Sequence, residues 1–409
     1  MKVVHLNNAD TSGGAARAAF RIHKSLIDRD THSRMWVNFS KSGDWTVKGP
    51  KGKLRKGISH IRRHLVSPVL KTMKTDNKIL HSPAIFPSSW SKRINKSDAD
   101  IIHLHWVGAE MASIADLGNI KKPAVWTLHD MWGFCGAEHV SWDERWREGY
   151  TRSNRSRNEK GFDINRWTWQ RKVKHWKEPF NIVAVSQWLA DCAQNSFLMK
   201  DWPVTIIPNC LNTDVWMPVD KSLARNMLGL PINVPIIAFG TYGANSEYHK
   251  GFDLLVEALK SLKSRVKDIE LAIFGQVAPK NPPELGFKVN FTGHLHDELS
   301  LRLLYSAIDM LVVPSRVEAF GQTATESMAC KTPVVAFGAT GLLDIVDHKL
   351  NGYLAKPFES EDLANGIEYI LNAQNYNQIC ENARDKVVKE FDSSVVSKKY
   401  QDLYYKVLR

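Results

Sequence analysis

The sequence predicts an α/β protein built from two doubly wound parallel-sheet domains, and three observations point to this fold class. The 409 residues fit two α/β domains of roughly 200 residues each. Short apolar runs rich in β-branched residues alternate with helix-length segments, and the runs lack polar alternation. Proline and polar residues interrupt the series around residues 208–218 and at 230–231. Such strands are buried on both faces, so helices are expected on both sides of each sheet.

Each run along the chain is assigned to an element in turn. We expect a Rossmann-like domain over residues 1–208, a second one over 209–390, and a C-terminal helix over 391–409 that packs back towards the first domain. The expected helices include Ala15–Leu26 and Phe252–Leu262. The expected strands are Lys2–Leu6, Ile101–Leu104, Ala124–Leu128, Asn181–Val185, Val204–Ile207, Ile236–Phe239, Glu270–Phe274, Met310–Val313 and Pro333–Ala336.

Composition excludes several classes of protein. Hydrophobic residues make up 43% of the chain and charged residues 24%, which excludes wholesale disorder and fibrous repeats. No run of eighteen apolar residues or secretory leader is evident, so a cytoplasmic location is expected. The cysteines are far apart and form no C-x-x-C pair, which argues against a disulfide framework or a zinc site. They are Cys135, Cys192, Cys210, Cys330 and Cys380.

The net charge of +12 is concentrated in two segments of the N-terminal half. Residues 48–78 hold ten Lys and Arg against one acid, and residues 144–177 hold eleven against four. The remainder of the chain is slightly acidic. The basicity therefore belongs to these two segments and not to the protein as a whole.

The first basic segment has an amphipathic helical pattern. An apolar stripe runs along one face while basic residues lie off it, as in an interfacial helix on anionic lipid. The alternative is a surface helix that packs on the core and exposes a solvated basic face. The stripe consists of Leu54, Ile58, Ile61, Leu65 and Val69, and the residues off it include Arg55, Lys56, Arg62, Arg63 and His64.

The second basic segment interleaves its Lys and Arg with tryptophans. These aromatics could stack on sugars, on bases or on each other, and the alternative is a loop followed by a packed helix. No zinc finger, RNA-recognition signature or helix-turn-helix spacing accompanies the charge, so no nucleic-acid partner is expected. The tryptophans are Trp146, Trp167, Trp169 and Trp176.

In the first half, candidate site residues follow expected strands. Gly13 and Gly14 precede a helix, where a backbone can approach a phosphate closely and helix amides favour an anion. His129 and Asp130 stand at the end of a strand, where the imidazole could hydrogen-bond a sugar hydroxyl or the reacting centre. His103 and His105 flank another strand end, and we assign them a structural role.

In the second half, Lys250 precedes a helix and could neutralise a diphosphate. Glu318 and Glu326 follow a strand with seven residues between them, so both can reach one elongated ligand. Carboxylates accept hydrogen bonds well from the hydroxyls of a hexose or a ribose. Solvated loop or helix residues remain the alternative for all three.

Together these blocks resemble the retaining nucleotide-sugar glycosyltransferases of family 4, which have the GT-B architecture of two Rossmann-like domains facing across a cleft. The resemblance extends over nearly the whole chain, and the E-x7-E interval is its most specific part. The matching blocks are Gly13-Gly14, Thr127-Leu128-His129-Asp130-Met131-Trp132, Val185-Ser186-Gln187-Trp188-Leu189, Ile207-Pro208-Asn209, Lys250-Gly251-Phe252, Pro314-Ser315, Glu318 to Glu326, Pro333-Val334-Val335 and Asn351-Gly352-Tyr353.

This resemblance implies that the C-terminal domain holds a nucleotide diphosphate sugar, UDP- or GDP-linked, and that no metal or cofactor is required. Catalytic roles are implied for His129, Lys250 and Glu318. Glu326 would accept from the ribose hydroxyls. The other donor-binding positions that it implies are Gly13, Gly14, Gly240, Gly275, Gly293, His294, Phe320, Gly321 and Gln322.

The resemblance further implies a saccharide acceptor, lipid-linked, in surface polysaccharide biosynthesis such as capsule or lipopolysaccharide, at the inner face of the cytoplasmic membrane. One departure concerns the arginine that usually follows the glycine at Gly240, where this chain has Thr241. Arg316 is a candidate replacement. Alternative functions are a nucleotide-sugar epimerase or sugar phosphorylase on the same fold, or a catalytically decayed protein that binds polyanions.

Overall fold

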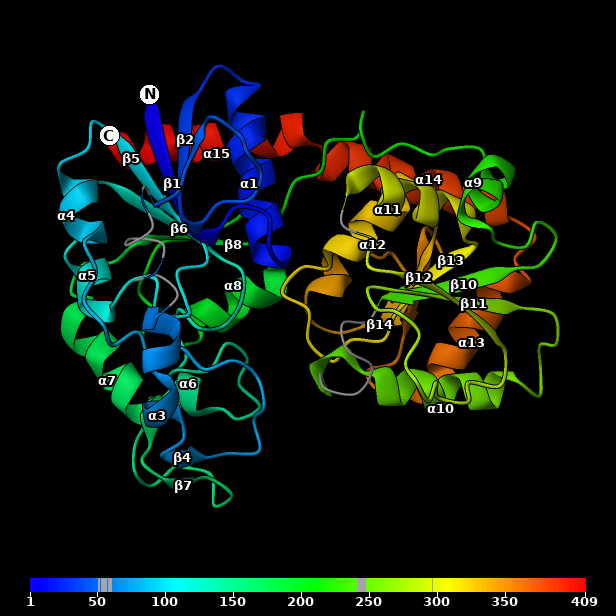
Figure 1. The fold of residues 1–409 in the computed structure, drawn as a ribbon, viewed down its shortest axis with the longest axis horizontal. Coiled ribbons are helices and arrows are strands. Elements are labelled where there is room, and N and C mark those ends of the chain that lie inside the picture. The colour runs from blue at the N-terminus through cyan, green and yellow to red at the C-terminus, as the bar shows by residue number, and fades with distance from the viewer. Residues whose placement is uncertain (51, 53–56, 58–60, 241–247, 296) are drawn as a thin grey trace. The chain divides into compact units, whose positions relative to one another are not determined.

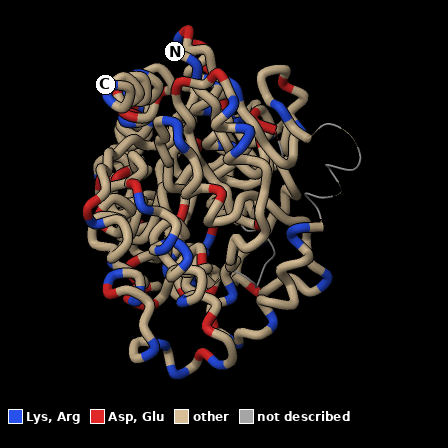
Figure 2. Tube along the Cα trace, turned by 90° about the vertical axis from the view of Figure 1, so that its left-hand side faces the viewer, with Lys and Arg blue, Asp and Glu red and all other residues tan. Residues whose placement is uncertain are grey.

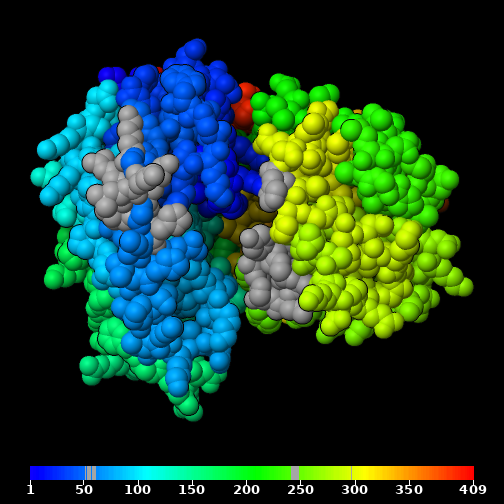
Figure 3. Space-filling view, viewed as in Figure 1, coloured from blue at the N-terminus to red at the C-terminus, as the bar shows by residue number. Residues whose placement is uncertain are grey.

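The computed structural model describes residues 1–409 except 51, 53–56, 58–60, 241–247 and 296. The chain divides into two compact units. Unit 1 comprises Met1–Cys210 and Val396–Arg409, and unit 2 comprises Leu211–Val395. The boundary expected from the sequence lies between residues 208 and 209. Figure 3 shows the atoms, with the N-terminal residues of unit 1 in blue and much of unit 2 in green and yellow.

Unit 1 is built on a parallel sheet of seven strands in the order β3-β2-β1-β5-β6-β8-β9 (Figure 1). A short antiparallel pair, β4 with β7, lies outside this sheet. The strands are β1 (Lys2–Ala9), β2 (His32–Phe39), β3 (Val47–Lys48), β4 (Met73–Lys74), β5 (Ile101–Leu104), β6 (Ala124–Leu128), β7 (Lys160–Gly161), β8 (Asn181–Ala184) and β9 (Val204–Ile206).

Helices cover both faces of the unit 1 sheet. One face packs against α1 and the C-terminal helix α15, through a core that includes Ile22, Val125 and Tyr400. On the other face Trp126 meets Trp176 at the end of α7, with 5.3 Å between ring centroids. The helices are α1 (Gly14–Ile27), α3 (Ser67–Leu70), α4 (Trp90–Asn95), α5 (Ile114–Gly118), α6 (Arg145–Glu148), α7 (Ile164–His175), α8 (Gln187–Gln194) and α15 (Ser393–Leu408).

The C-terminal helix joins unit 1 through a regular apolar stripe. Val396, Tyr400, Leu403 and Tyr404 recur at intervals of four, three and one residues, which places them on one helical face. All four are buried against strands β1, β5, β6 and β8. Tyr405, the next residue along, is 55% exposed. The last residues of the chain therefore complete the core that the first residues begin.

Unit 2 has a parallel sheet of six strands in the order β12-β11-β10-β13-β14-β15. Its core lies between one face of this sheet and helices α10 and α13. The strands are β10 (Ile236–Gly240), β11 (Glu270–Phe274), β12 (Lys288–Gly293), β13 (Met310–Val313), β14 (Val334–Phe337) and β15 (Gly352–Ala355). The helices are α9 (Lys221–Leu228), α10 (Phe252–Leu262), α11 (Glu298–Ala307), α12 (Gln322–Ala329), α13 (Ser360–Leu371) and α14 (Tyr376–Glu390), with the 3₁₀ turns η1 (Tyr248–Lys250) and η2 (Thr340–Asp344).

Two parallel sheets with helices on their faces confirm the predicted α/β class of two Rossmann-like halves. In the unit 1 sheet, β1 pairs with β2 on one side and with β5 on the other. In the unit 2 sheet, β10 pairs with β11 on one side and with β13 on the other. The direction in which successive strands are added therefore reverses at β1 and at β10. Ligands of open α/β sheets gather at such a switch point, outside the carboxyl ends of the strands. Ligand-binding residues are therefore expected at the carboxyl ends of β1, β6, β10, β11 and β13.

Candidate functional site

In unit 2, Lys250 lies at the end of η1, directly before α10. Its position depends on Gly251, which adopts the left-handed φ of 66° that favours glycine. A Cβ at residue 251 would overlap the carbonyl oxygen of Pro314, the residue that follows β13. The close approach of these two loops carries Lys250 towards the segment after β13.

Lys250 and Glu318 form an ion pair with 2.6 Å between Nζ and Oε1. The Ser315 hydroxyl donates to the same carboxylate oxygen at 3.0 Å. Burial raises the pKa of the Glu318 carboxyl, but Lys250 and Ser315 outweigh burial, so the pKa lies below its ordinary value. Glu318 is therefore a carboxylate near neutral pH, and its partner Lys250 keeps 42% of its side-chain surface exposed.

The backbone of Glu318 is fixed at the turn after β14. Its N–H donates to the Thr340 hydroxyl at 3.0 Å, and its carbonyl accepts from the Gly341 N–H at 2.9 Å. The loop after β13 is thus held from two sides, by η1 and by η2. Lys250 and Glu318, which are far apart in the sequence, meet because β10 and β13 are neighbours in the sheet.

Glu326 lies within α12 and is 3% exposed. The Tyr305 hydroxyl donates to its Oε2 at 3.2 Å. Gly321 precedes α12 with a φ of 113°, and Gln322 begins the helix. Phe320 is 3% exposed and packs edge-on against Phe391 at 5.5 Å, so its side chain belongs to the core of unit 2.

Arg316 is engaged with the start of α10. Its guanidinium donates to both carboxylate oxygens of Asp253, at 2.7 and 2.5 Å, and to the Tyr248 carbonyl at 2.8 Å. It also lies over the Tyr248 ring, 3.9 Å from the centroid. Arg316 therefore links the loop after β13 to η1 and to the start of α10. Thr241, the position of the departure noted above, lies outside the described residues.

The glycines expected near a base lie together at the carboxyl ends of adjacent strands. The Gly275 N–H, after β11, donates to the Gly293 carbonyl at the end of β12, at 2.9 Å. Both have positive φ, 88° and 73°. His294 follows and is exposed, and Gly240 ends β10 with Phe274 against its Cα. The carboxyl ends of β11 and β12 are thus joined by a hydrogen bond, with the exposed His294 directly after them.

In unit 1, Gly13 and Gly14 are exposed between β1 and α1, and Gly13 has a φ of 93°. His129 and Asp130 directly follow β6. Asp130 Oδ2 accepts from His139 Nδ1 at 2.6 Å and from Trp106 Nε1 at 2.8 Å. These two bonds engage the Asp130 carboxylate and hold the loop after β6 in place. Of these two residues, His129 is therefore the candidate to contact a ligand.

Two further histidines are bonded to His129 in series, and this connection is not among the sequence-based predictions. His105 Nδ1 lies 3.1 Å from His129 Nε2, and His105 Nε2 lies 2.9 Å from His5 Nδ1. For His105 only a structural role is predicted. The signal was available in the alternation of strands, because residues 5, 103, 105, 127 and 129 all have odd numbers and the registered pairs place them on one face.

These histidines predict a loss of stability in weak acid. Burial lowers the pKa of His23 and of His129 to about 4, and of His5, His103 and His105 well below the ordinary value. Between about pH 6.5 and these lowered values the unfolded chain binds more protons than the folded one. The stability that these neutral histidines contribute to unit 1 is therefore fully present above about pH 6.5 and should be lost as the pH falls, by about 2 kcal/mol at pH 5 for a group such as His23, whose pKa is about 4.

Urea denaturation at pH 7.5 and pH 5 measures this effect. His23→Gln should show a smaller difference between the two pH values than wild type, because one titrating group is gone. His32→Gln, at an exposed position, is the matched control and should keep the wild-type difference. An unchanged urea midpoint between the two pH values would contradict the prediction.

Much of the second basic segment serves internal structure. Arg145, whose side chain is 2% exposed, pairs with Glu159 at 3.1 Å and Asp163 at 2.7 Å. Lys172 is fully buried and donates to the carbonyls of Trp132, Cys135 (3.0 Å) and Gly136 (2.8 Å). These bonds hold the loop that follows His129. In Figure 2 acidic residues are interspersed among the basic ones on the face turned to the viewer.

The first basic segment is described in part. Leu54, Arg55, Lys56 and Ile58 lie outside the described residues, whereas residues 61–65 are helical. Ile61 is 55% and Leu65 51% exposed, and Arg62 donates to the carbonyls of Phe86, Pro87 and Glu110. Among the described residues, no helix has the length and apolar character that crossing a bilayer requires.

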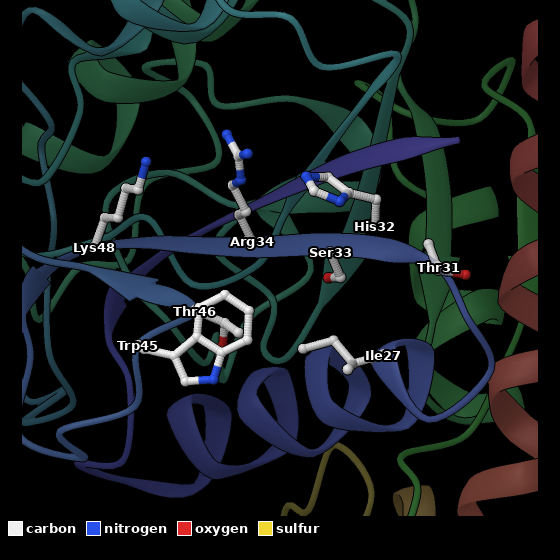
Figure 4. Close-up of a pocket in the computed structure, with 8 residues that line it drawn as sticks. All are labelled: Ile27, Thr31, His32, Ser33, Arg34, Trp45, Thr46 and Lys48. Carbon is white, nitrogen blue, oxygen red and sulfur yellow. The ribbon is translucent and has the colours of Figure 1, made fainter.

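Figure 4 shows a cavity of about 290 Å³ in unit 1, where α1 faces the start of β2. Trp45 and Ile27 lie on one side of β2, while Arg34 and Lys48 point to the other side. Ser33 and Thr46 both hydrogen-bond His23, at 2.7 Å each. The cavity thus lies at the amino end of the strands, the edge of the sheet opposite to His129.

Two family models match this chain in succession. The model described as Glycosyltransferase Family 4 matches residues 12–215, and the one described as Glycosyl transferases group 1 matches residues 239–386. The chain belongs to these glycosyltransferases. The boundary between the two matches falls near the division between units 1 and 2.

Curated proteins that are similar to this chain match it over only part of their own length. An uncharacterized glycosyltransferase of Methanocaldococcus jannaschii is 27% identical over 239 residues, which is 56% of this chain and 60% of the relative. A D-inositol 3-phosphate glycosyltransferase of Xylanimonas cellulosilytica is 32% identical over 167 residues, 37% of this chain and 39% of the relative. The alignments therefore span from about two fifths to three fifths of these relatives.

Solved structures resemble the family member over almost its full length. Sucrose-phosphate synthase from Thermosynechococcus elongatus aligns with a TM-score of 0.66 at 18% identity, covering 100% of this chain and 99% of that one. HepE of Anabaena, in complex with UDP-glucose, aligns with a TM-score of 0.66 at 18% identity, covering 99% and 100%. This likeness confirms the predicted GT-B fold class.

Proposed function

We propose that this protein transfers a sugar from a nucleotide diphosphate sugar, UDP- or GDP-linked, to a hydroxyl of a saccharide acceptor, with retention at the anomeric carbon. The observation that carries the proposal is the Lys250–Glu318 pair at the carboxyl end of the unit 2 sheet. Membership of glycosyltransferase families supports it, as does the structural neighbour HepE, whose crystal structure is a complex with UDP-glucose.

The proposed chemistry needs a cation where negative charge develops. As the bond from the anomeric carbon to the diphosphate breaks, the diphosphate gains charge, and the Lys250 ammonium offsets it. Glu318 holds that ammonium in place and offers its carboxylate to the hydroxyls of the sugar. The acceptor hydroxyl attacks on the face that the diphosphate leaves, and its proton passes to the departing diphosphate oxygen as the new bond to the anomeric carbon forms. The step therefore uses no side-chain nucleophile, and Lys250 supplies the positive charge without a metal.

On the nucleotide, Glu326 would accept hydrogen bonds from the ribose hydroxyls, and the Gly275–Gly293 edge would receive the base. In unit 1, Gly13 and Gly14 would leave room for the diphosphate, and His129 would contact the transferred sugar.

We propose a lipid-linked acceptor of surface polysaccharide synthesis, with the protein held peripherally at an anionic membrane. Exposed Ile61 and Leu65 within a basic segment support this, and salt-sensitive sedimentation with anionic vesicles tests it.

Calorimetry with UDP, GDP and ADP tests nucleotide recognition. We expect one diphosphate to bind, and Glu326→Gln to weaken its binding about tenfold, because a neutral amide oxygen accepts less strongly from the ribose hydroxyls than a carboxylate. Glu368→Gln, on α13, is a matched control and should bind as wild type does.

Absence of binding by all three nucleotides would contradict the proposal and favour the decayed polyanion-binding protein. Product analysis with the acceptor omitted separates transfer from epimerisation, because an epimerase would continue to turn over. A phosphorylase would be recognised by its requirement for inorganic phosphate.

A further inference from the structure

We propose that the buried pair His5 and His105 fixes the tautomer of His129, so that His129 presents its Nδ1–H as a hydrogen-bond donor to an oxygen of the ligand. His5 and His105 are then positioning residues that act through His129. The identity of the ligand rests on the proposed function, whereas the state of the imidazole rests on the geometry alone.

The three imidazoles form one hydrogen-bonded series across neighbouring strands. His5 lies on β1, His105 directly follows β5, and His129 directly follows β6. His5 is 0% and His105 2% exposed. The series runs from His5 Nδ1 to His105 Nε2 at 2.9 Å, and from His105 Nδ1 to His129 Nε2 at 3.1 Å. It therefore begins in the core and ends at the carboxyl edge of the sheet.

A neutral imidazole carries one N–H, so every bond in this series has the same direction. The protons occupy either Nδ1 of all three rings or Nε2 of all three. Burial lowers the pKa of each ring, which keeps the series neutral near pH 7. The choice between the two directions then depends on the ends of the series.

The inner end selects the direction. His5 Nε2 is buried and has no hydrogen-bond partner among the described residues. A proton on this atom would be a buried N–H without an acceptor, which is rare in folded proteins. The Nδ1–H direction avoids it: His5 donates to His105, and His105 donates to His129. His129 Nε2 is then an acceptor, and its proton is on Nδ1.

Neighbouring residues prevent His105 from turning over. The His103 ring lies against His105, with 4.0 Å between ring centroids and an interplanar angle of 34°. His103 is itself held by the Thr127 hydroxyl at 2.7 Å and the Tyr404 hydroxyl at 2.6 Å. A rotation of the His105 ring by half a turn would put carbon atoms in the places of both bonded nitrogens and lose the bonds to His5 and His129, so these two bonds fix the order of its nitrogens.

Two members of the series, His5 and His105, together with the neighbouring His103, could be taken for a metal site. The candidate ligand atoms of His5, His103 and His105 lie within 4.8 Å of one another. However, both nitrogens of His103, both of His105 and Nδ1 of His5 already have hydrogen-bond partners. A cation would have to break these bonds, whereas the tautomer series keeps the bonds of His5 and His105 and leaves those of His103 intact.

Nitrogen-15 NMR of the full-length, histidine-labelled protein tests the inference directly, because two-bond proton–nitrogen spectra distinguish Nδ1–H from Nε2–H. At pH 7.5 we expect His129 as the Nδ1–H form, with its signal assigned by its loss in His129→Gln. An Nε2–H or doubly protonated His129 would overturn the inference. So would loss of the His5 and His105 signals on adding one equivalent of zinc, which is expected to leave them unchanged.

Variants of His105 provide a second test of the inference. His105→Phe removes the donor to His129, so His129 should become a mixture of tautomers and kcat/KM for sugar transfer should fall about tenfold. His105→Gln can accept from His5 and donate to His129, and should restore most of both. His103→Phe disturbs the same core but removes no hydrogen bond of the series, so His129 should stay Nδ1–H.

A mixed tautomer in the His103→Phe variant, or no change in His105→Phe, would overturn the inference. The outcome separates from that of the proposed function. If the Nδ1–H form is found and no sugar transfer occurs, the proposed function fails and the inference stands. If transfer occurs with His129 as Nε2–H, the inference fails alone.

Discussion

Replacing Lys250 with methionine is expected to lower kcat/KM for sugar transfer by a factor of about 10² to 10³ while the protein remains folded. The ammonium of Lys250 is the charge that we propose to stabilise the departing diphosphate, and loss of one such group costs about this much. Steady-state kinetics with the donor identified by calorimetry measure the effect. Lys260→Met, at an exposed position of α10, is the matched control and should behave as wild type.

A double variant distinguishes two explanations of such a loss. Lys250 forms an ion pair with Glu318, so its removal also leaves a partly buried carboxylate with one partner fewer. If Lys250 served only to neutralise Glu318, the double variant Lys250→Met with Glu318→Gln would be as active as Glu318→Gln alone. We expect it to be less active than Glu318→Gln, because the diphosphate still lacks its cation. Wild-type kcat/KM in Lys250→Met would refute the assignment.

Replacing Tyr404 with alanine is expected to destabilise unit 1 by about 4 kcal/mol. Tyr404 is fully buried against the sheet, and its hydroxyl bonds His103 Nδ1 at 2.6 Å. The substitution therefore creates a large cavity and leaves a buried nitrogen without a partner. Tyr404→Phe fills the cavity but still orphans His103, so it should cost about 1 to 3 kcal/mol.

Urea denaturation followed by circular dichroism measures both losses. The neighbouring Tyr405 is 55% exposed, which makes Tyr405→Ala a control at the adjacent position of the same helix. It should change the unfolding free energy by less than about 0.5 kcal/mol. Equal losses for Tyr404→Ala and Tyr405→Ala would show that α15 does not pack on unit 1 as described.

Strands buried on both faces were predictable because they read as continuous apolar runs. The predicted Ile101–Leu104, Ala124–Leu128, Glu270–Phe274 and Met310–Val313 coincide with β5, β6, β11 and β13. Strand β2 was not predicted, because only Ser33, Met35 and Val37 of its eight residues are buried and the intervening residues are polar or partly exposed. Edge strand β12 has no fully buried residue, so it gives no apolar signal either.

Part of the site followed from spacing and part did not. Lys250 and Glu318 were expected to serve one ligand, and the structure places them in contact because β10 and β13 are neighbours in the sheet. The partner of Arg316 could not be predicted, since pairing with Asp253 depends on how closely the loop after β13 approaches η1. Strand alternation indicates that His105 and His129 can share a face of the sheet, but their contact also requires β5 and β6 to be neighbours, and local sequence patterns do not specify strand order.

The connectivity of the two units has a consequence for biosynthesis. The chain leaves unit 1 after Cys210 and returns to it at Val396, so unit 2 is an insertion within unit 1. During translation every residue of unit 2 emerges before residues 396–409, which supply the last part of the unit 1 core. Unit 2 can therefore reach its native state first, although it comes second in the sequence. One face of the unit 1 sheet therefore stays partly uncovered until residues 396–409 have emerged from the ribosome.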